Sequence, residues 1–131
     1  MLGATNIFSI KSQILRRRVI LHTHLVVEAP DECGHRAEYE NKVRAIELID
    51  EKVLAPIVEY FEDKGEDFAV LVCPDHPTPL VTRTHSRNPV PYMIYRSNKA
   101  VAGADTFTEE TAESTGTYIP EGYTLMSHFI G

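Results

Sequence analysis

The chain has 131 residues, enough to enclose one hydrophobic core, and its 43% hydrophobic and 24% charged residues are typical of a globular protein. No apolar run approaches the roughly 20 residues of a membrane helix and no signal peptide is evident, which argues against a membrane protein. The net charge of −6 argues against nucleic acid or an anionic membrane as partner, whereas bound divalent metals would still allow a phosphorylated ligand.

The first predicted strand covers residues 19–27, VILHTHLVV, because the run is mostly apolar and β-branched, while residues 1–18 show little pattern. Residues 36–63 then predict a long helix. Its apolar stripe recurs every three or four residues at Val43, Ile46, Ile49, Val53, Ile57 and Tyr60. Pro56 falls inside this stripe and predicts a kink or split, and Gly65 is a suitable C-terminal cap.

Residues 68–73, FAVLVC, predict a second strand, buried on both faces. Strand, helix and strand form a βαβ unit, so we expect the two strands to be parallel. Residues 90–95, VPYMIY, predict a third strand, antiparallel to the second because only a loop joins them. Residues 106–115 open with a capping-box pattern from Thr106 to Glu109 and predict a short helix, and residues 122–131 predict a last helical turn or two. The predicted fold class is α/β, in one domain over residues 1–131.

Acids and histidines follow the predicted strands. Asp31 and His35 come after the first strand, Asp75 and His76 after the second, and His85 lies in the loop before the third. With parallel first and second strands and an antiparallel third strand, all five converge on the edge where open α/β sheets bind ligands. Imidazole and carboxylate together are a good ligand set for divalent metals.

Roles in structure alone are the alternative to metal binding for these residues. Asp31 would also serve as a helix cap, and a single loop histidine such as His85 is commonly a surface residue. His22 and His24 share one face of a strand and are expected to be structural, and His128 is expected at the surface. Gly34 is expected to allow a tight turn between Asp31 and His35.

Two cysteines, Cys33 and Cys73, are too few for a disulfide scaffold and indicate the reducing cytoplasm. Both lie beside the acid–histidine segments, where soft metal ligation is an alternative to a structural role. The neighbouring Asp and His residues are better placed as ligands.

Four segments carry a family resemblance: VEAPDECGH (27–35), PDHPTPLVTRTHSRNPVPYMIY (74–95), FTEETA (107–112) and GYTLM (122–126). They resemble the C-terminal part of the archaeal-type 2,3-bisphosphoglycerate-independent phosphoglycerate mutases, within the alkaline phosphatase-like superfamily. The similarity runs from about His24 to the end. The resemblance implies a partial alkaline phosphatase-like sheet with flanking helices, and an isomerase of glycolysis that interconverts 3-phosphoglycerate and 2-phosphoglycerate through a phosphoserine.

The resemblance also implies two divalent cations, with Mn²⁺, Zn²⁺ and Mg²⁺ all suited to parts of the site. Carried over by motif, Asp31, His35 and His85 would bind one metal, and Asp75 and His76 the other. The family's nucleophilic serine has no counterpart here, since Ser9 and Ser12 fit no such motif. Tyr123 stands where many relatives have a histidine.

We therefore expect a truncated mutase, inactive alone, that self-associates or pairs with another chain to cover its apolar surface. Two alternatives stay open from the sequence. One is a metal-binding fragment without catalysis, and the other is a phosphomutase or phosphohydrolase acting on another phosphate ester.

Overall fold

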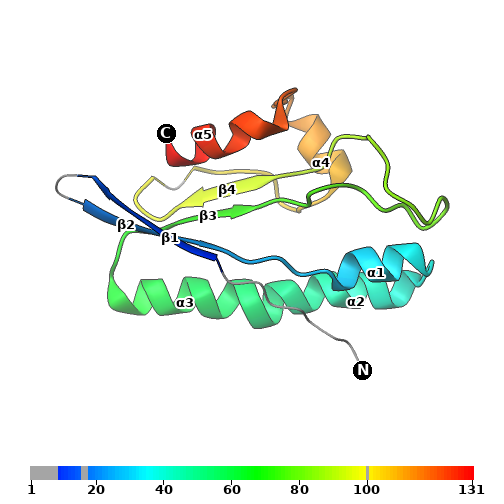
Figure 1. The fold of residues 1–131 in the computed structure, drawn as a ribbon, viewed down its shortest axis with the longest axis horizontal. Coiled ribbons are helices and arrows are strands. Elements are labelled where there is room, and N and C mark those ends of the chain that lie inside the picture. Colours follow the sequence, from blue (N-terminus) through cyan, green and yellow to red (C-terminus); the bar gives the residue numbers. More distant parts are fainter. Residues whose placement is uncertain (1–8, 16–17, 100) are drawn as a thin grey trace. The chain divides into compact units, whose positions relative to one another are not determined.

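The computed structural model describes the backbone of residues 9–15, 18–99 and 101–131, and the side chains of residues 23–99 and 101–131 (Figure 1). The chain divides into two compact units. The first runs up to Ala55 and includes the separate segment Thr78–Thr84; the second comprises Pro56–Pro77 and His85–Gly131. The single domain expected over residues 1–131 stays a prediction.

The described part of the first unit contains an antiparallel pair of strands followed by two helices. Strands β1 (Ser9–Leu15) and β2 (Arg18–His24) pair antiparallel, in a register that runs from Ser9↔His24 to Leu15↔Arg18. Helices α1 (Ala29–His35) and α2 (Tyr39–Ile49) follow and pack on each other. The π-helical segment η1 (Asp50–Leu54) comes next along the chain.

Helix α1 forms where a tight turn was expected, so that prediction was wrong. Pro30 in the first turn has the backbone angle that a helix start requires, and the acidic side chains of Asp31 and Glu32 favour a helix N-terminus. The helix ends at His35, and the chain reverses at Ala37, which has a positive φ of 56°. The turn therefore lies after His35 and not at Gly34.

The buried residues of the first unit include Cys33, Ala45 and Thr78. Cys33 is 2% exposed, Ala45 5% and Thr78 4%. Cys33 comes from α1 and Ala45 from α2, whereas Thr78 comes from a segment far along the chain. Thr78 is thus a polar residue in a place that apolar side chains normally fill, and it needs a hydrogen-bond partner there.

The long helix predicted over residues 36–63 is interrupted as Pro56 implied. The π-helical segment η1 ends just before α3 (Ala55–Lys64), and the Ala55 N–H donates to the carbonyl of Asp50. Gly65 has the predicted cap conformation, with a φ of 64° and a bond from its N–H to the Glu62 carbonyl. Within the stripe, Val43, Ile46, Ile57 and Tyr60 are all exposed.

The second unit contains α3 and a two-stranded antiparallel sheet. Strand β3 (Ala69–Val72) pairs with β4 (Met93–Arg96), in a register from Ala69↔Arg96 to Val72↔Met93, which confirms the predicted antiparallel third strand. The ring of Phe68 stacks on Phe61 with centroids 5.4 Å apart and lies 5.7 Å from the ring of Tyr95. These rings join α3 to the sheet.

Three short helices complete the second unit: α4 (Glu109–Ser114), the 3-10 turn η2 (Gly122–Thr124) and α5 (Leu125–Ile130). The cap of α4 is Thr108, whose hydroxyl accepts from the Thr111 N–H, so the predicted cap at Thr106 was two residues early. The Arg96 guanidinium donates to the carbonyl oxygens of His128 and Phe129 and ties α5 to β4.

The α/β fold class is confirmed, but the strand pairing differs from the predicted βαβ unit. In the part of the chain that the structure describes, β2 pairs with β1 and β3 pairs with β4, without a parallel ladder between β2 and β3. Residues 9–15, which showed no clear pattern, supply the partner of β2. Strand β3 is also less covered than expected, since Ala69 is exposed and the next three residues are only half-buried.

Candidate metal centre

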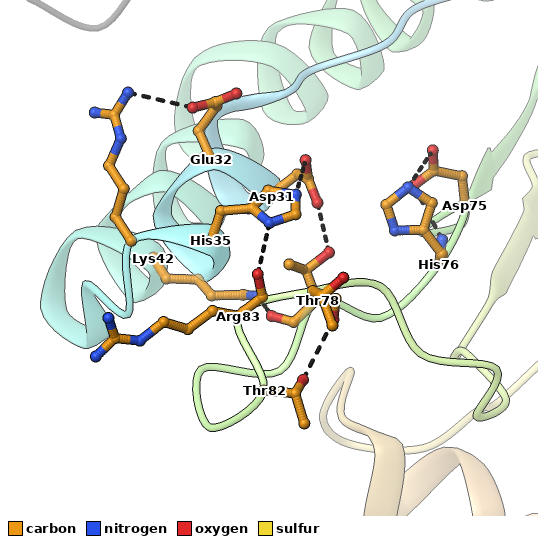
Figure 2. Close-up of polar contacts among 11 residues, drawn as sticks. Asp31, Glu32, His35, Lys42, Asp75, His76, Thr78, Thr82 and Arg83 are labelled. Carbon is orange, nitrogen blue, oxygen red and sulfur yellow. Dashed lines mark hydrogen bonds and ion pairs between the residues drawn. The ribbon is translucent and has the colours of Figure 1, made fainter.

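Helix α1 places Asp31 and His35 on one face, because residues four apart in a helix lie one turn above each other. His35 Nε2 lies 3.3 Å from Asp31 Oδ2 (Figure 2). About a third of each side chain is exposed, 36% for His35 and 33% for Asp31. The pair is therefore held by the helix and remains open to an ion from solvent.

A backbone carbonyl fixes the tautomer of His35. Its Nδ1 lies 2.8 Å from the carbonyl oxygen of Arg83, and since a carbonyl can only accept, Nδ1 must carry the proton (Figure 2). Arg83 has a positive φ of 56°, an unusual conformation for a residue with a side chain. In the neutral imidazole, Nε2 then presents its lone pair to the Asp31 carboxylate.

Two electron-rich atoms 3.3 Å apart need a positive charge between or on them, either a proton on Nε2 or a bound cation. Two ligands about 2.1 Å from a tetrahedral Zn²⁺ are about 3.4 Å from each other, so the observed spacing suits a shared cation. A histidine that binds a metal commonly donates its other N–H to a backbone carbonyl, as His35 does to Arg83. Asp31 and His35 therefore fit a divalent metal.

Thr78 supports this pair, and the sequence interpretation assigned it no role. Its hydroxyl donates to Asp31 Oδ1 at 2.5 Å, and its carbonyl accepts from the Lys42 ammonium at 2.7 Å (Figure 2). The available signal was its place in the PDHPTP motif, two residues after His76. Its burial and its partners could not be read from that motif.

The second unit brings the other three predicted ligands together in the loop between β3 and β4. The His76 backbone N–H donates to Asp75 Oδ1 at 3.0 Å, and His76 Nε2 lies 3.3 Å from Asp75 Oδ2. The rings of His76 and His85 stack with centroids 3.6 Å apart. A bond from the Ser86 N–H to the Pro77 carbonyl closes the intervening loop and brings His85 back to His76.

The cysteines and the remaining described histidines differ from these five residues. Burial, and then the charge of Asp75, raise the pKa of the Cys73 thiol, which favours the protonated form that metals bind poorly. Cys33 is buried in the core of the first unit. His24 is exposed, and His128 is at the surface as predicted. His22 lies in β2, where its side chain is outside the described residues.

Each unit thus assembles part of the predicted ligand set: Asp31 with His35 in the first, and Asp75 with His76 and His85 in the second. Binding of one metal by Asp31, His35 and His85 together stays a prediction.

Among the described residues, every helix is too short or too polar to span a membrane.

Comparison with protein families identifies the class. The model of the Metalloenzyme superfamily matches residues 11–126, which is most of the chain, and the chain belongs to this superfamily. The match starts earlier than the resemblance noted from about His24. A search of solved structures found no match.

Curated relatives make the resemblance more specific. The chain is 43% identical over 103 residues to the 2,3-bisphosphoglycerate-independent phosphoglycerate mutase of Methanosarcina mazei, and 46% identical over 103 residues to that of Methanothrix thermoacetophila. It is 42% identical over 109 residues to a probable mutase of the same name from Geobacter sulfurreducens. These matches cover 78%, 79% and 80% of the chain, but only 25%, 26% and 26% of the relatives. The chain therefore spans about a quarter of their length, and the resemblance to the mutases is confirmed.

Proposed function

We propose that this chain supplies the metal ligands of a 2,3-bisphosphoglycerate-independent phosphoglycerate mutase, which interconverts 3-phosphoglycerate and 2-phosphoglycerate. The observation that carries the proposal is the Asp31–His35 pair. His35 has one nitrogen committed to the Arg83 carbonyl and the other facing a carboxylate oxygen at 3.3 Å. This is the arrangement of a histidine prepared to bind a metal.

In this proposal Asp31, His35 and His85 hold one divalent cation, and Asp75 and His76 hold a second. Bound cations would polarise the phosphoryl oxygens and lower the pKa of an attacking hydroxyl. Asp31 and His35 keep their relative geometry through α1, and the loop that carries Asp75, His76 and His85 is closed by the Ser86–Pro77 bond. Mn²⁺ and Zn²⁺ are the cations that this mixture of imidazole and carboxylate suits best.

The nucleophilic serine of the proposed reaction would come from a polypeptide segment outside this sequence. We propose that the same polypeptide covers the exposed apolar stripe of α2 and α3 and completes the substrate site. Ile46, which is 52% exposed, then becomes a contact residue. Ile46→Glu should weaken the association between the two polypeptides, measured by sedimentation velocity.

The cations also reconcile the charge of the chain with its proposed substrate. A chain with a net charge of −6 repels a phosphate ester unless bound metals reverse the local field. The free cysteines Cys33 and Cys73 suit a reducing compartment, and we propose the cytoplasm as the location.

The direct test is complementation. The chain is mixed with the part of the Methanosarcina mazei mutase that it does not match, and 2-phosphoglycerate formation is followed with Mn²⁺ present. We expect turnover in the mixture and none from either polypeptide alone. If the two polypeptides form a complex and bind metal but show no turnover, the proposed mutase activity is contradicted. That result would favour a metal-binding role without catalysis.

Matched histidine variants make the test specific. His35→Ala should abolish turnover and lower the Mn²⁺ content per chain. His24→Ala, which removes an exposed histidine of β2 outside the proposed site, should change neither. Equal effects of the two substitutions would contradict the ligand assignment.

A further inference from the structure

Asp31 has two carboxylate oxygens with different surroundings. Oδ1 accepts a hydrogen bond from the Thr78 hydroxyl at 2.5 Å, whereas Oδ2 faces His35 Nε2 at 3.3 Å. Figure 2 shows the two contacts, one at each oxygen of the Asp31 carboxyl group. A carboxylate rotates readily about its last torsion, so a bond to one oxygen decides where the other one points.

Thr78 is itself held from three directions. It is 4% exposed, so water has little access to its hydroxyl. Its carbonyl accepts from Lys42 Nζ at 2.7 Å, which anchors the backbone of the segment to α2. Gly34 of α1 packs so closely on it that an added Cβ would lie 2.6 Å from the Thr78 carbonyl oxygen. The hydroxyl is therefore fixed in space before any ligand binds.

We propose that Thr78 is a positioning residue for the metal centre: it holds Asp31 Oδ1 so that Oδ2 is presented beside His35 to a divalent cation. The inference rests on the proposed function of Asp31 and His35 as ligands. Thr78 does not touch the cation. It acts through Asp31, and Lys42 acts through Thr78.

The consequence is a difference in metal affinity between variants that differ by one hydroxyl. Thr78→Val keeps nearly the same volume and removes the donor, so Asp31 loses its fixed orientation. Loss of such an outer contact weakens metal binding by about 10- to 100-fold. Thr78→Ser retains the donor and should stay close to the unchanged chain, although it removes a methyl group from the core.

The experiment is a calorimetric titration of the full 131-residue chain with Mn²⁺. All proteins carry Asp75→Ala, so that the second set of ligands does not contribute. We expect the Thr78→Ser variant to bind Mn²⁺ about as tightly as the chain with Thr78. The Thr78→Val variant alone should lose about 10- to 100-fold in Mn²⁺ affinity. Circular dichroism of each metal-free variant reports whether it is folded.

The outcomes distinguish a failure of the proposed function from a failure of the proposed role of Thr78. No Mn²⁺ binding by the Asp75→Ala chain would contradict the proposed function of the site. Binding that is equal in the valine and threonine chains would overturn the inference alone. Equal weakening by serine and valine would also overturn it, because packing and not the hydroxyl would then be responsible.

A second variant covers the case in which Thr78→Val does not fold. Lys42→Met keeps an apolar stem on α2 and removes the bond to the Thr78 carbonyl, leaving the hydroxyl in place. We expect it to weaken Mn²⁺ binding by less than the loss of the hydroxyl, and Lys42→Arg to restore part of the affinity. Unchanged affinity in Lys42→Met would then overturn the inference.

Discussion

Gly34→Ala tests how tightly α1 is packed against the Thr78 segment. An added Cβ would lie 2.6 Å from the Thr78 carbonyl oxygen, 2.9 Å from Thr78 Cγ2 and 2.9 Å from Lys42 Nζ. The lysine end can move, but the carbonyl and the methyl group belong to a buried residue. Reaching the 3.4 Å limit of ordinary contact requires the Thr78 oxygen to shift by about 0.8 Å.

Two opposing free-energy terms decide the result. Alanine is favoured over glycine inside a helix by up to about 1 kcal/mol. Forcing an extra carbon into a filled site costs about 1–3 kcal/mol, and displacement of Thr78 also strains its bonds to Asp31 and Lys42. Packing outweighs propensity, and we expect the free energy of unfolding to fall by about 1–2 kcal/mol.

The assay is urea unfolding followed by circular dichroism, with Gly122→Ala as the matched control. Gly122 begins the 3-10 turn η2, and nothing lies within 4 Å of an added Cβ there. The control should be neutral or stabilising by up to about 1 kcal/mol. If Gly34→Ala proves as stable as the unchanged chain, the close approach of α1 to Thr78 is wrong.

Three further predictions concern local contacts. The Lys52 ammonium lowers the pKa of the neighbouring Glu51 carboxyl, chiefly through their hydrogen bond. Lys52→Met should therefore raise the Glu51 pKa toward its ordinary value in an NMR titration, and an unchanged pKa would contradict the contact. Because the folded-state pKa is lowered, any stabilisation from this exposed pair is present above the ordinary Glu pKa and is lost as the pH falls through the folded-state pKa. The Tyr123 hydroxyl donates a hydrogen bond to the Glu121 carboxylate, and this bond raises the pKa of Tyr123. Glu121→Gln should therefore lower the Tyr123 pKa in the same NMR titration, and a pKa that stays raised would exclude Glu121 as the cause. Thr108→Ala should cost about 1 kcal/mol and speed amide exchange in α4, whereas Thr108→Ser should not; equal exchange in the two variants would argue against the cap.

The predictions that held depend on neighbours in sequence. Pro56 lacks an N–H wherever it is placed, so an irregular helical segment beside it follows from residue type alone. Gly65 adopts a left-handed cap because nothing else in that stretch does so without strain. Asp31 and His35 also lie close together, although the tight turn predicted between them was wrong, because a helix brings residues four apart onto one face.

Strand pairing and helix boundaries were less predictable because nonlocal contacts compete with local pattern. The unpatterned residues 9–15 pair with β2, and no rule of periodicity selects that partner over β3. The short helix α1 depends on packing against α2, which outweighs its low intrinsic tendency as a seven-residue segment.

The sequence by itself determined the family, the α/β class and the five Asp and His residues that are candidates for metal binding. Only the tertiary structure decided how two of those residues, Asp31 and His35, are oriented. Thr78 lies 47 residues from Asp31 and Arg83 lies 48 from His35, yet one orients the carboxylate and the other selects the imidazole tautomer. Both effects depend on hydrogen bonds with directions set by the folded chain, and one uses a backbone carbonyl that every residue possesses. Such a contact cannot be predicted from the residue types, because it forms only when the chain folds.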